Sequence, residues 1–147
     1  MMSALLQQAF CELEAVYIDL ERHDGAESCR ACGQCCWFEV AGHSLFATRL
    51  ETLYLLEKAG APARPFTAKR CGYHQGRRCR AREGRVLGCR IYRCEEAGGF
   101  CSEVAERALA EIKRISLSNG IPMEYAILHA RIADLLAAGL GETCSGE

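Results

Sequence analysis

Residues 29–36 read CRACGQCC and place four cysteines within eight positions. The two residues between Cys29 and Cys32 allow a tight turn that directs both sulfur atoms at one metal, and Gly33 relieves the backbone crowding in that turn. Three cysteines spaced by two residues, with a fourth at a distance, are typical ligands of a [4Fe–4S] cluster. The same spacing also suits zinc. The stretch therefore predicts a metal-binding loop around which the chain is organised.

A second cysteine group follows later in the chain, with gaps of seven, nine and four residues between its members. These gaps are too long for one tight turn, so we expect a loop that brings ligands to a site from its far side. Thiolates are soft ligands and select iron–sulfur clusters or zinc over magnesium or calcium. Eight thiolates can close two four-ligand sites, or one site with some cysteines left structural, and the sequence leaves both open. The predicted ligands are Cys29, Cys32, Cys35, Cys36, Cys71, Cys79, Cys89 and Cys94.

The segment 69–94 is rich in arginine, with nine basic residues against the single acidic residue Glu83. One reading is a surface for an anionic partner, including nucleic acid. The reading we favour is compensation, because four thiolates on a dication leave a negative centre that nearby guanidinium groups offset. Aromatic residues are sparse among these arginines, which argues against nucleic acid. The residues expected around the metal centre are Arg85, Arg90, Tyr92 and Trp37.

His74 lies three residues after Cys71 and is an alternative ligand in place of one cysteine. Histidine serves this role at zinc and in Rieske centres. A solvated loop histidine is the more common situation, so the cysteine set is preferred.

Composition bounds the class of protein. The chain has 147 residues, of which 50% are hydrophobic, and this is enough for one domain with a core of its own. Its net charge of −1 implies no nucleic-acid or membrane partner from the overall charge balance. Eleven cysteines would suit a disulfide scaffold, but the number is odd, Cys35 and Cys36 are adjacent, and acidic residues interrupt the N-terminal apolar region where a secretory signal would lie. We therefore expect a cytoplasmic, soluble protein with reduced thiols and no membrane partner.

Apolar periodicity predicts a mainly α single domain, residues 1–147, in which about four helices carry two irregular cysteine-rich loops. The helices are expected at 3–22, 45–59, 102–118 and 122–138. Ser3 and Ser44 are candidate N-caps, and Pro122 stands at a favoured first helical position. A short hairpin is expected near 82–85. The apolar stripe of the first helix needs a partner surface, which is either the chain's own core or a second copy of the chain.

Residues 26–96 resemble the YkgJ-type cysteine-cluster proteins, described as a zinc- or iron-chelating domain. Members share a C-x2-C-G-x-C-C block, which is matched fully at 29–36, and then a segment similar to C-x7-C-x-I-Y-x-x-R-P-x-x-C-R. The positions that match this second segment are Cys71, Cys79, Arg85, Cys89 and Arg90, with Tyr92 and Cys94 suiting its end. Val86 replaces the usual proline and Ala81-Arg82 the usual Ile-Tyr pair. The resemblance implies a metal or iron–sulfur protein, and a related flagellin lysine methylase couples a similar block to methyl transfer.

Three functions follow from these observations. The leading one is an iron–sulfur protein, most simply with a [4Fe–4S] cluster, that transfers electrons to or supports a redox or other protein partner. The second is a structural Zn²⁺ domain whose folded surface binds another macromolecule. The third is a cluster-dependent enzyme in which Arg85 or Arg90 holds an anionic substrate. No catalytic motif accompanies the cysteines, so whether the protein is an enzyme stays open.

Overall fold

The computed structural model describes residues 3–23, 45–62, 66–67, 69–75, 78–91 and 102–139. These residues form a mainly helical fold with five α-helices and two short strand pairs, which confirms the predicted fold class. The predicted residues 29–36, Trp37, Tyr92 and Cys94 lie outside the described part of the chain.

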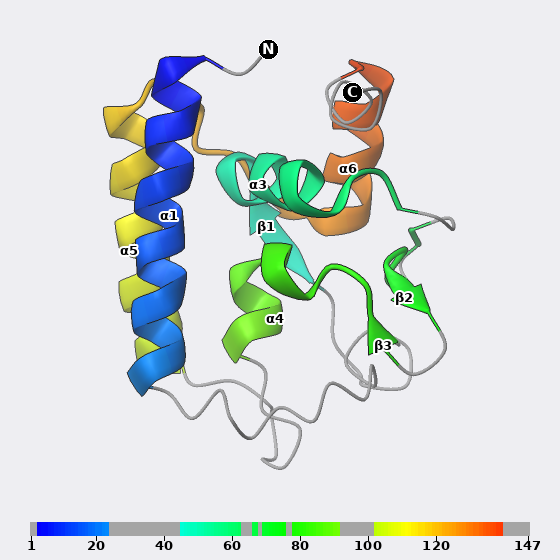
Figure 1. Cartoon of the computed structure of the whole chain (residues 1–147), viewed down its shortest axis with the longest axis horizontal. Coiled ribbons are helices and arrows are strands. Elements are labelled where there is room, and N and C mark those ends of the chain that lie inside the picture. The colour runs from blue at the N-terminus through cyan, green and yellow to red at the C-terminus, as the bar shows by residue number, and fades with distance from the viewer. Residues whose placement is uncertain are drawn as a thin grey trace.

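Two long helices form one side of the molecule (Figure 1). Helix α1 (Ala4–His23) and helix α5 (Ser102–Ser118) lie side by side and run in opposite directions. Ser3 caps α1 as predicted, because its Oγ accepts a hydrogen bond from the amide of Leu6 at 3.1 Å. The predicted stripe of α1 faces the chain's own core, where Phe10, Leu13, Tyr17 and Leu20 are buried.

The predicted helix 45–59 is a strand followed by a helix. Strand β1 (Phe46–Thr48) pairs antiparallel with β4 (Tyr125–Ile127), and helix α3 (Arg49–Ala59) starts only after Thr48. Thr48 is the N-cap, with extended backbone, and forms a capping box with Glu51. Phe46, the first residue of β1, is 43% exposed, while Ala47 and Thr48 are buried.

The predicted helix 122–138 is shortened in the same way. Its first part forms β4, and helix α6 (Leu128–Ala137) begins six residues after Pro122. The Pro122 carbonyl accepts a hydrogen bond from the amide of Glu124, so the proline stands in a turn that leads into the strand. The prediction for Pro122 at a first helical position was therefore wrong.

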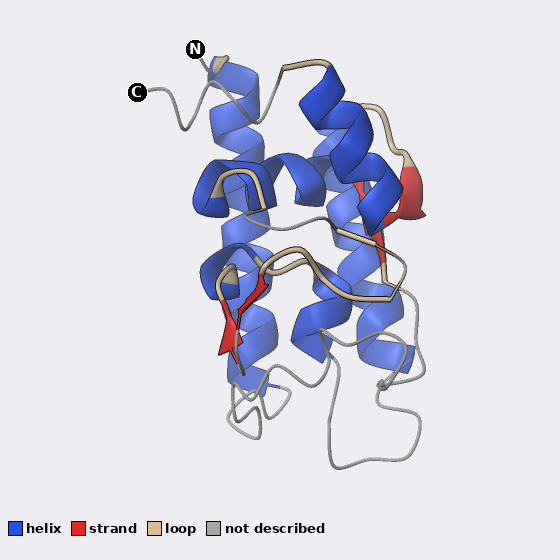
Figure 2. Cartoon of the chain, turned by 90° about the vertical axis from the view of Figure 1, so that its right-hand side faces the viewer, coloured by secondary structure: helices blue, strands red, loops and turns tan. Residues whose placement is uncertain are grey.

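The segment between α3 and α5 contains more regular structure than predicted. Strands β2 (His74–Gln75) and β3 (Arg78–Cys79) form a hairpin, and the 3-10 helix η3 (Arg82–Gly84) leads to helix α4 (Leu87–Ile91). The hairpin predicted near 82–85 is thus η3, and the actual hairpin lies earlier. Figure 2 shows the two strand pairs at separate places among the helices.

Two apolar clusters make up the core, and α3 contributes to both. The first cluster joins α1, α3 and α5 through side chains such as Leu13, Leu50 and Ile112. The second joins α3, α6 and the cysteine-bearing segment through Leu55, Val86 and Ile132. Helix α3 therefore connects the helix pair to the region where the second cysteine group lies.

Candidate metal centre

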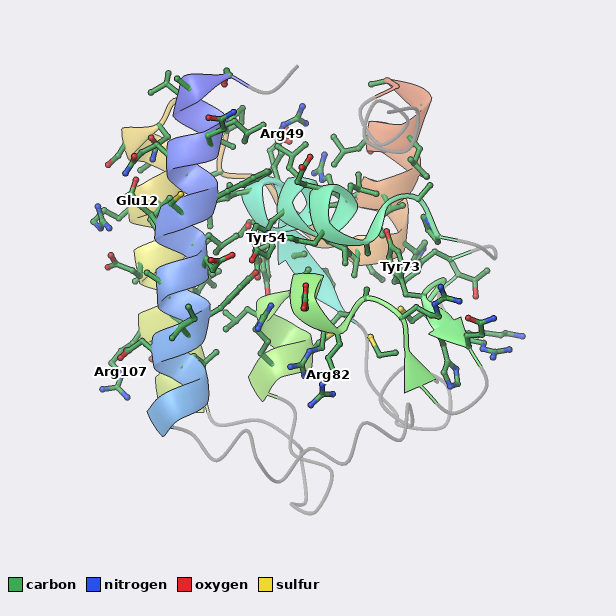
Figure 3. The ribbon with its side chains drawn as sticks, in the orientation of Figure 1. Glu12, Arg49, Tyr54, Tyr73, Arg82 and Arg107 are labelled. Carbon is green, nitrogen blue, oxygen red and sulfur yellow. The ribbon has the colours of Figure 1, made fainter. Side chains whose placement is uncertain are left out.

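Three cysteines of the second group gather on the second apolar cluster. Cys71 precedes β2 and is buried within the cluster, while Cys79 on β3 and Cys89 on α4 are half-buried and pack against it. Figure 3 shows sulfur atoms in yellow between α4 and the β2–β3 hairpin, close to the labelled Tyr73. The structure thus brings three predicted ligands, one each from a turn, a strand and a helix, to one part of the core.

A tight turn presents the sulfur of Cys71. The Cys71 carbonyl accepts a hydrogen bond from the amide of His74 at 3.2 Å, and its Sγ accepts one from the amide of Tyr73 at 3.4 Å. Backbone N–H groups directed at sulfur are typical of the outer contacts that orient metal-binding thiolates. The Tyr73 hydroxyl donates to the carbonyl of Gly60 at 2.7 Å, which joins this turn to the end of α3. Burial and the nearby Cys71 and Cys79 raise the pKa of Tyr73.

His74 is buried and sits directly opposite Cys79 in the hairpin. The neighbouring pair in the ladder is Tyr73 and Arg80, and the Arg80 amide donates a hydrogen bond to the Tyr73 carbonyl. Because hydrogen-bonded and non-hydrogen-bonded pairs alternate along an antiparallel ladder, His74 and Cys79 form a non-hydrogen-bonded pair with both side chains on one face. The expected solvated loop histidine is therefore a core residue, only 1% exposed.

The tautomer of His74 bears on its use as a ligand. Nδ1 accepts a hydrogen bond from Nε of Arg70 at 3.0 Å. A neutral imidazole with an acceptor at Nδ1 carries its proton on Nε2, so neither nitrogen offers a lone pair to a metal in this arrangement. The geometry favours the cysteines over His74 as ligands and makes Nε2–H of His74 a hydrogen-bond donor.

The two arginines expected around the centre contact the main chain that carries Cys89. Arg85 donates from Nε to the carbonyl of Arg82 at 2.9 Å. Arg90 donates to the carbonyls of Arg85 and Glu83, both at 2.7 Å, and its guanidinium lies 3.8 Å from the centre of the Tyr17 ring. Arg90 therefore ties the η3–α4 segment together and packs it onto α1.

Glu51 is a buried residue that the sequence analysis missed. Its carboxylate is 0% exposed and accepts four hydrogen bonds, from the amide and hydroxyl of Thr48, the hydroxyl of Tyr17 and the amide of Leu87. Burial raises the pKa of Glu51 despite these donors, and burial with the nearby Glu51 carboxylate raises the pKa of Tyr17. The T-x-x-E pattern of residues 48–51 is the sequence signal for the capping part of this arrangement.

Within the described ranges, no three His, Cys, Asp or Glu side chains are placed so that they could share one metal ion. No helix in that part of the chain is both long and apolar enough to span a bilayer. Comparisons with protein-family models, with curated proteins and with solved structures return no match.

Proposed function

We propose that the protein binds a metal centre through cysteine thiolates, most simply a [4Fe–4S] cluster, and uses it to exchange electrons with a protein partner. The observation that carries the proposal is that Cys71, Cys79 and Cys89 pack against the same core cluster. They are not placed to share one metal ion among themselves, so a common centre would need a further ligand such as one from residues 29–36. A half-buried position at an apolar surface suits a cluster, because burial tunes its reduction potential while an edge stays accessible to a partner. The resemblance of 26–96 to the YkgJ-type family supports the same reading.

The arrangement of the helix ends adds support. The end of α1, the end of α4 and the start of α5 lie at the same end of the molecule, and these three helices pack on one another (Figure 1). His23 is the last residue of α1 and leads to the first cysteine block, while Ile91 ends α4 and leads to Cys94. The two cysteine-bearing segments are therefore attached to neighbouring points of the scaffold.

A structural zinc domain is the second candidate. The β2–β3 hairpin has only two residues in each strand, which is too short for stability on its own. Metal binding contributes folding free energy to such elements without any redox chemistry. The third reading, an enzyme that holds an anionic substrate through Arg85 or Arg90, gains no support from the main-chain contacts of these residues.

Anaerobic purification followed by metal and sulfide analysis separates the two candidates. A cluster gives a brown protein with about equal amounts of iron and acid-labile sulfide. A colourless protein with stoichiometric zinc would overturn the electron-transfer proposal and leave the zinc domain, and a protein without bound metal would overturn both.

Single cysteine variants then test the ligands. Serine replacement of Cys71, Cys79 or Cys89 should each lower the metal content, because serine is a poor ligand for these metals. Cys11→Ser is the matched control, since Cys11 is exposed on α1, away from the second cluster, and its replacement should leave the metal content unchanged. If the serine variants of Cys71, Cys79 and Cys89 all kept their full metal content, these three cysteines would not be ligands.

A further inference from the structure

We infer that Glu51 is a positioning residue for the metal centre, because its buried carboxylate fixes the helix that carries Cys89. This inference rests on the proposed function, since it concerns the placement of one proposed ligand. It assigns to a carboxylate in the core a role that lies outside the cysteine-rich segments.

The two oxygens of Glu51 have different partners. Oε2 accepts from the amide of Thr48 at 2.9 Å and from its hydroxyl at 3.1 Å, which completes the N-cap of α3. Oε1 accepts from the Tyr17 hydroxyl at 3.2 Å and from the Leu87 amide at 2.6 Å. One oxygen therefore serves the cap of its own helix, and the other joins α1 and α4 to α3.

Helix α4 depends on such contacts for its position. It has only five residues, Leu87–Ile91, and a helix of this length has little stability of its own. Leu87 is its first residue, so the 2.6 Å bond to Glu51 holds the start of the helix, and Cys89 follows two residues later. Gly88 lies between them, where an added Cβ would stand 2.5 Å from Cδ1 of Leu45. Both Leu87 and Gly88 therefore hold the start of α4 close to the core.

A second link acts on the same helix from α1. The guanidinium of Arg90 lies over the ring of Tyr17, whose hydroxyl donates to Glu51. Glu51, Tyr17 and Arg90 therefore form a connected set in which an anion, a phenol and a cation span α3, α1 and α4. Loss of the carboxylate leaves the Leu87 amide and the Tyr17 hydroxyl buried without this acceptor, which costs free energy. A shift of α4 would lower that cost, and it would also move Cys89.

Glu51→Gln removes one acceptor at constant shape. If the amide nitrogen takes the place of Oε1, it faces the donor amide of Leu87, and if it takes the place of Oε2, it faces the amide of Thr48. Thr48→Ala is the matched control, because it removes the capping hydroxyl and leaves both partners of Oε1 in place. Both variants weaken the cap of α3 when the nitrogen stands at Oε2, and Glu51→Gln alone acts directly on α4 when the nitrogen stands at Oε1 and faces the Leu87 amide.

The experiment measures how fast the purified, metal-loaded full chain releases its metal to excess chelator, together with its visible spectrum and its urea unfolding. We expect Glu51→Gln to release metal on the order of 10-fold faster than Thr48→Ala, in line with losses seen when residues that orient ligands are replaced. The visible spectrum of Glu51→Gln should also shift relative to the control. Equal release rates and unchanged spectra in the two variants would overturn the inference and leave metal binding intact.

Two further outcomes separate a failure of the proposed function from a failure of this inference. A wild-type protein without metal defeats the proposed function itself, and with it the inference. If Glu51→Gln does not fold, Tyr17→Phe serves in its place, because it removes one donor to Oε1 and the polar end of the Arg90-stacked ring while the Leu87 bond remains. Tyr17→Phe should then release metal faster than Thr48→Ala, because Glu51 loses its link to the ring under Arg90, and an equal rate would overturn the claim that the Glu51, Tyr17 and Arg90 set positions α4.

Discussion

The hydroxyl of Tyr17 on α1 donates a hydrogen bond to the buried carboxylate of Glu51 on α3, at 3.2 Å and across 34 positions of sequence. Tyr17→Phe should lower the free energy of unfolding by about 1.5–3 kcal/mol, the range for a hydrogen bond to a charged group. Tyr54→Phe is the comparison, because the Tyr54 hydroxyl donates to Glu14, whose side chain is half exposed, and should cost less than about 1 kcal/mol. Urea unfolding checks both values, and a larger loss for Tyr54→Phe would contradict this ranking.

The raised pKa of Glu51 predicts a pH dependence with a definite sign. The folded protein holds the Glu51 proton more tightly than the unfolded chain does, because burial disfavours the ionised form. The free energy of unfolding of the wild type, measured relative to Glu51→Gln, should therefore fall as the pH rises from the ordinary value of 4.5 through the folded pKa, and then level off. A tenfold difference in proton affinity between the folded and unfolded states corresponds to about 1.4 kcal/mol. Urea unfolding of both proteins at several pH values from 4.5 upward tests the sign. If the stability of the wild type relative to Glu51→Gln increased with pH, the predicted sign would be wrong.

Arg90 should be sensitive to shape as well as to charge. Arg90→Lys keeps the positive charge but loses the planar group that lies over Tyr17 and bonds two carbonyls. We expect a loss of about 1–2 kcal/mol in the free energy of unfolding. Arg107→Lys is the control, since Arg107 is exposed on α5 and points away from the molecule in Figure 3, and should stay within about 0.5 kcal/mol of the wild type. Similar losses in the two variants would show that the stack and the carbonyl contacts contribute nothing.

Gly84 and Gly60 should resist replacement for different reasons. An added Cβ at Gly84 would stand 3.2 Å from Cα of Leu55 and 3.1 Å from Cβ of Lys58, so Gly84→Ala should push η3 away from α3 at a cost of about 1–3 kcal/mol. Gly60 has open space around it but a φ of 71° and a ψ of −169°, a backbone conformation that essentially only glycine adopts, so Gly60→Ala should cost about 1–3 kcal/mol through backbone strain.

Asparagine distinguishes the two cases, because it is larger than alanine but, like alanine, has a Cβ that the backbone conformation of Gly60 disfavours. Asn and Ala should cost about the same at Gly60, where the backbone conformation sets the cost, and Asn should be more harmful than Ala at Gly84, where space does, as measured by thermal unfolding. The same order of the two substitutions at both positions would refute the assignment of causes.

The sequence predicted the long helices well and the short strands poorly. The stripes of α1 and α5 repeat over many turns, so their presence and limits are encoded locally, and Ser3 marks the start of α1. Strand β1 has three residues, and its partner β4 lies about 80 positions away. Phe46 fits a helical stripe as well as a strand, so nothing near it in the sequence signals the pairing.

The candidate centre divides in a similar way. Cys71, Cys79 and Cys89 were predicted from residue type and family pattern, and the structure places them on one cluster. Burial of His74 and its hydrogen bond from Arg70 could not be predicted, because both depend on the hairpin register. Glu51 was recognisable as part of a capping box from residues 48–51, but its bonds to Tyr17 and Leu87 join residues 34 and 36 positions apart.

The pairing of α1 with α5 has a consequence for synthesis of the chain. The apolar stripe of α1 is covered by a helix that begins about 80 residues after α1 ends, so its partner leaves the ribosome much later. At elongation rates of about 5–20 residues per second, Phe10, Leu13 and Leu20 wait on the order of 5–20 seconds for that cover. Although nearly all of its regular structure is helical, the protein depends on contacts between distant segments, and it should fold more slowly than helical proteins whose neighbours in sequence pack together.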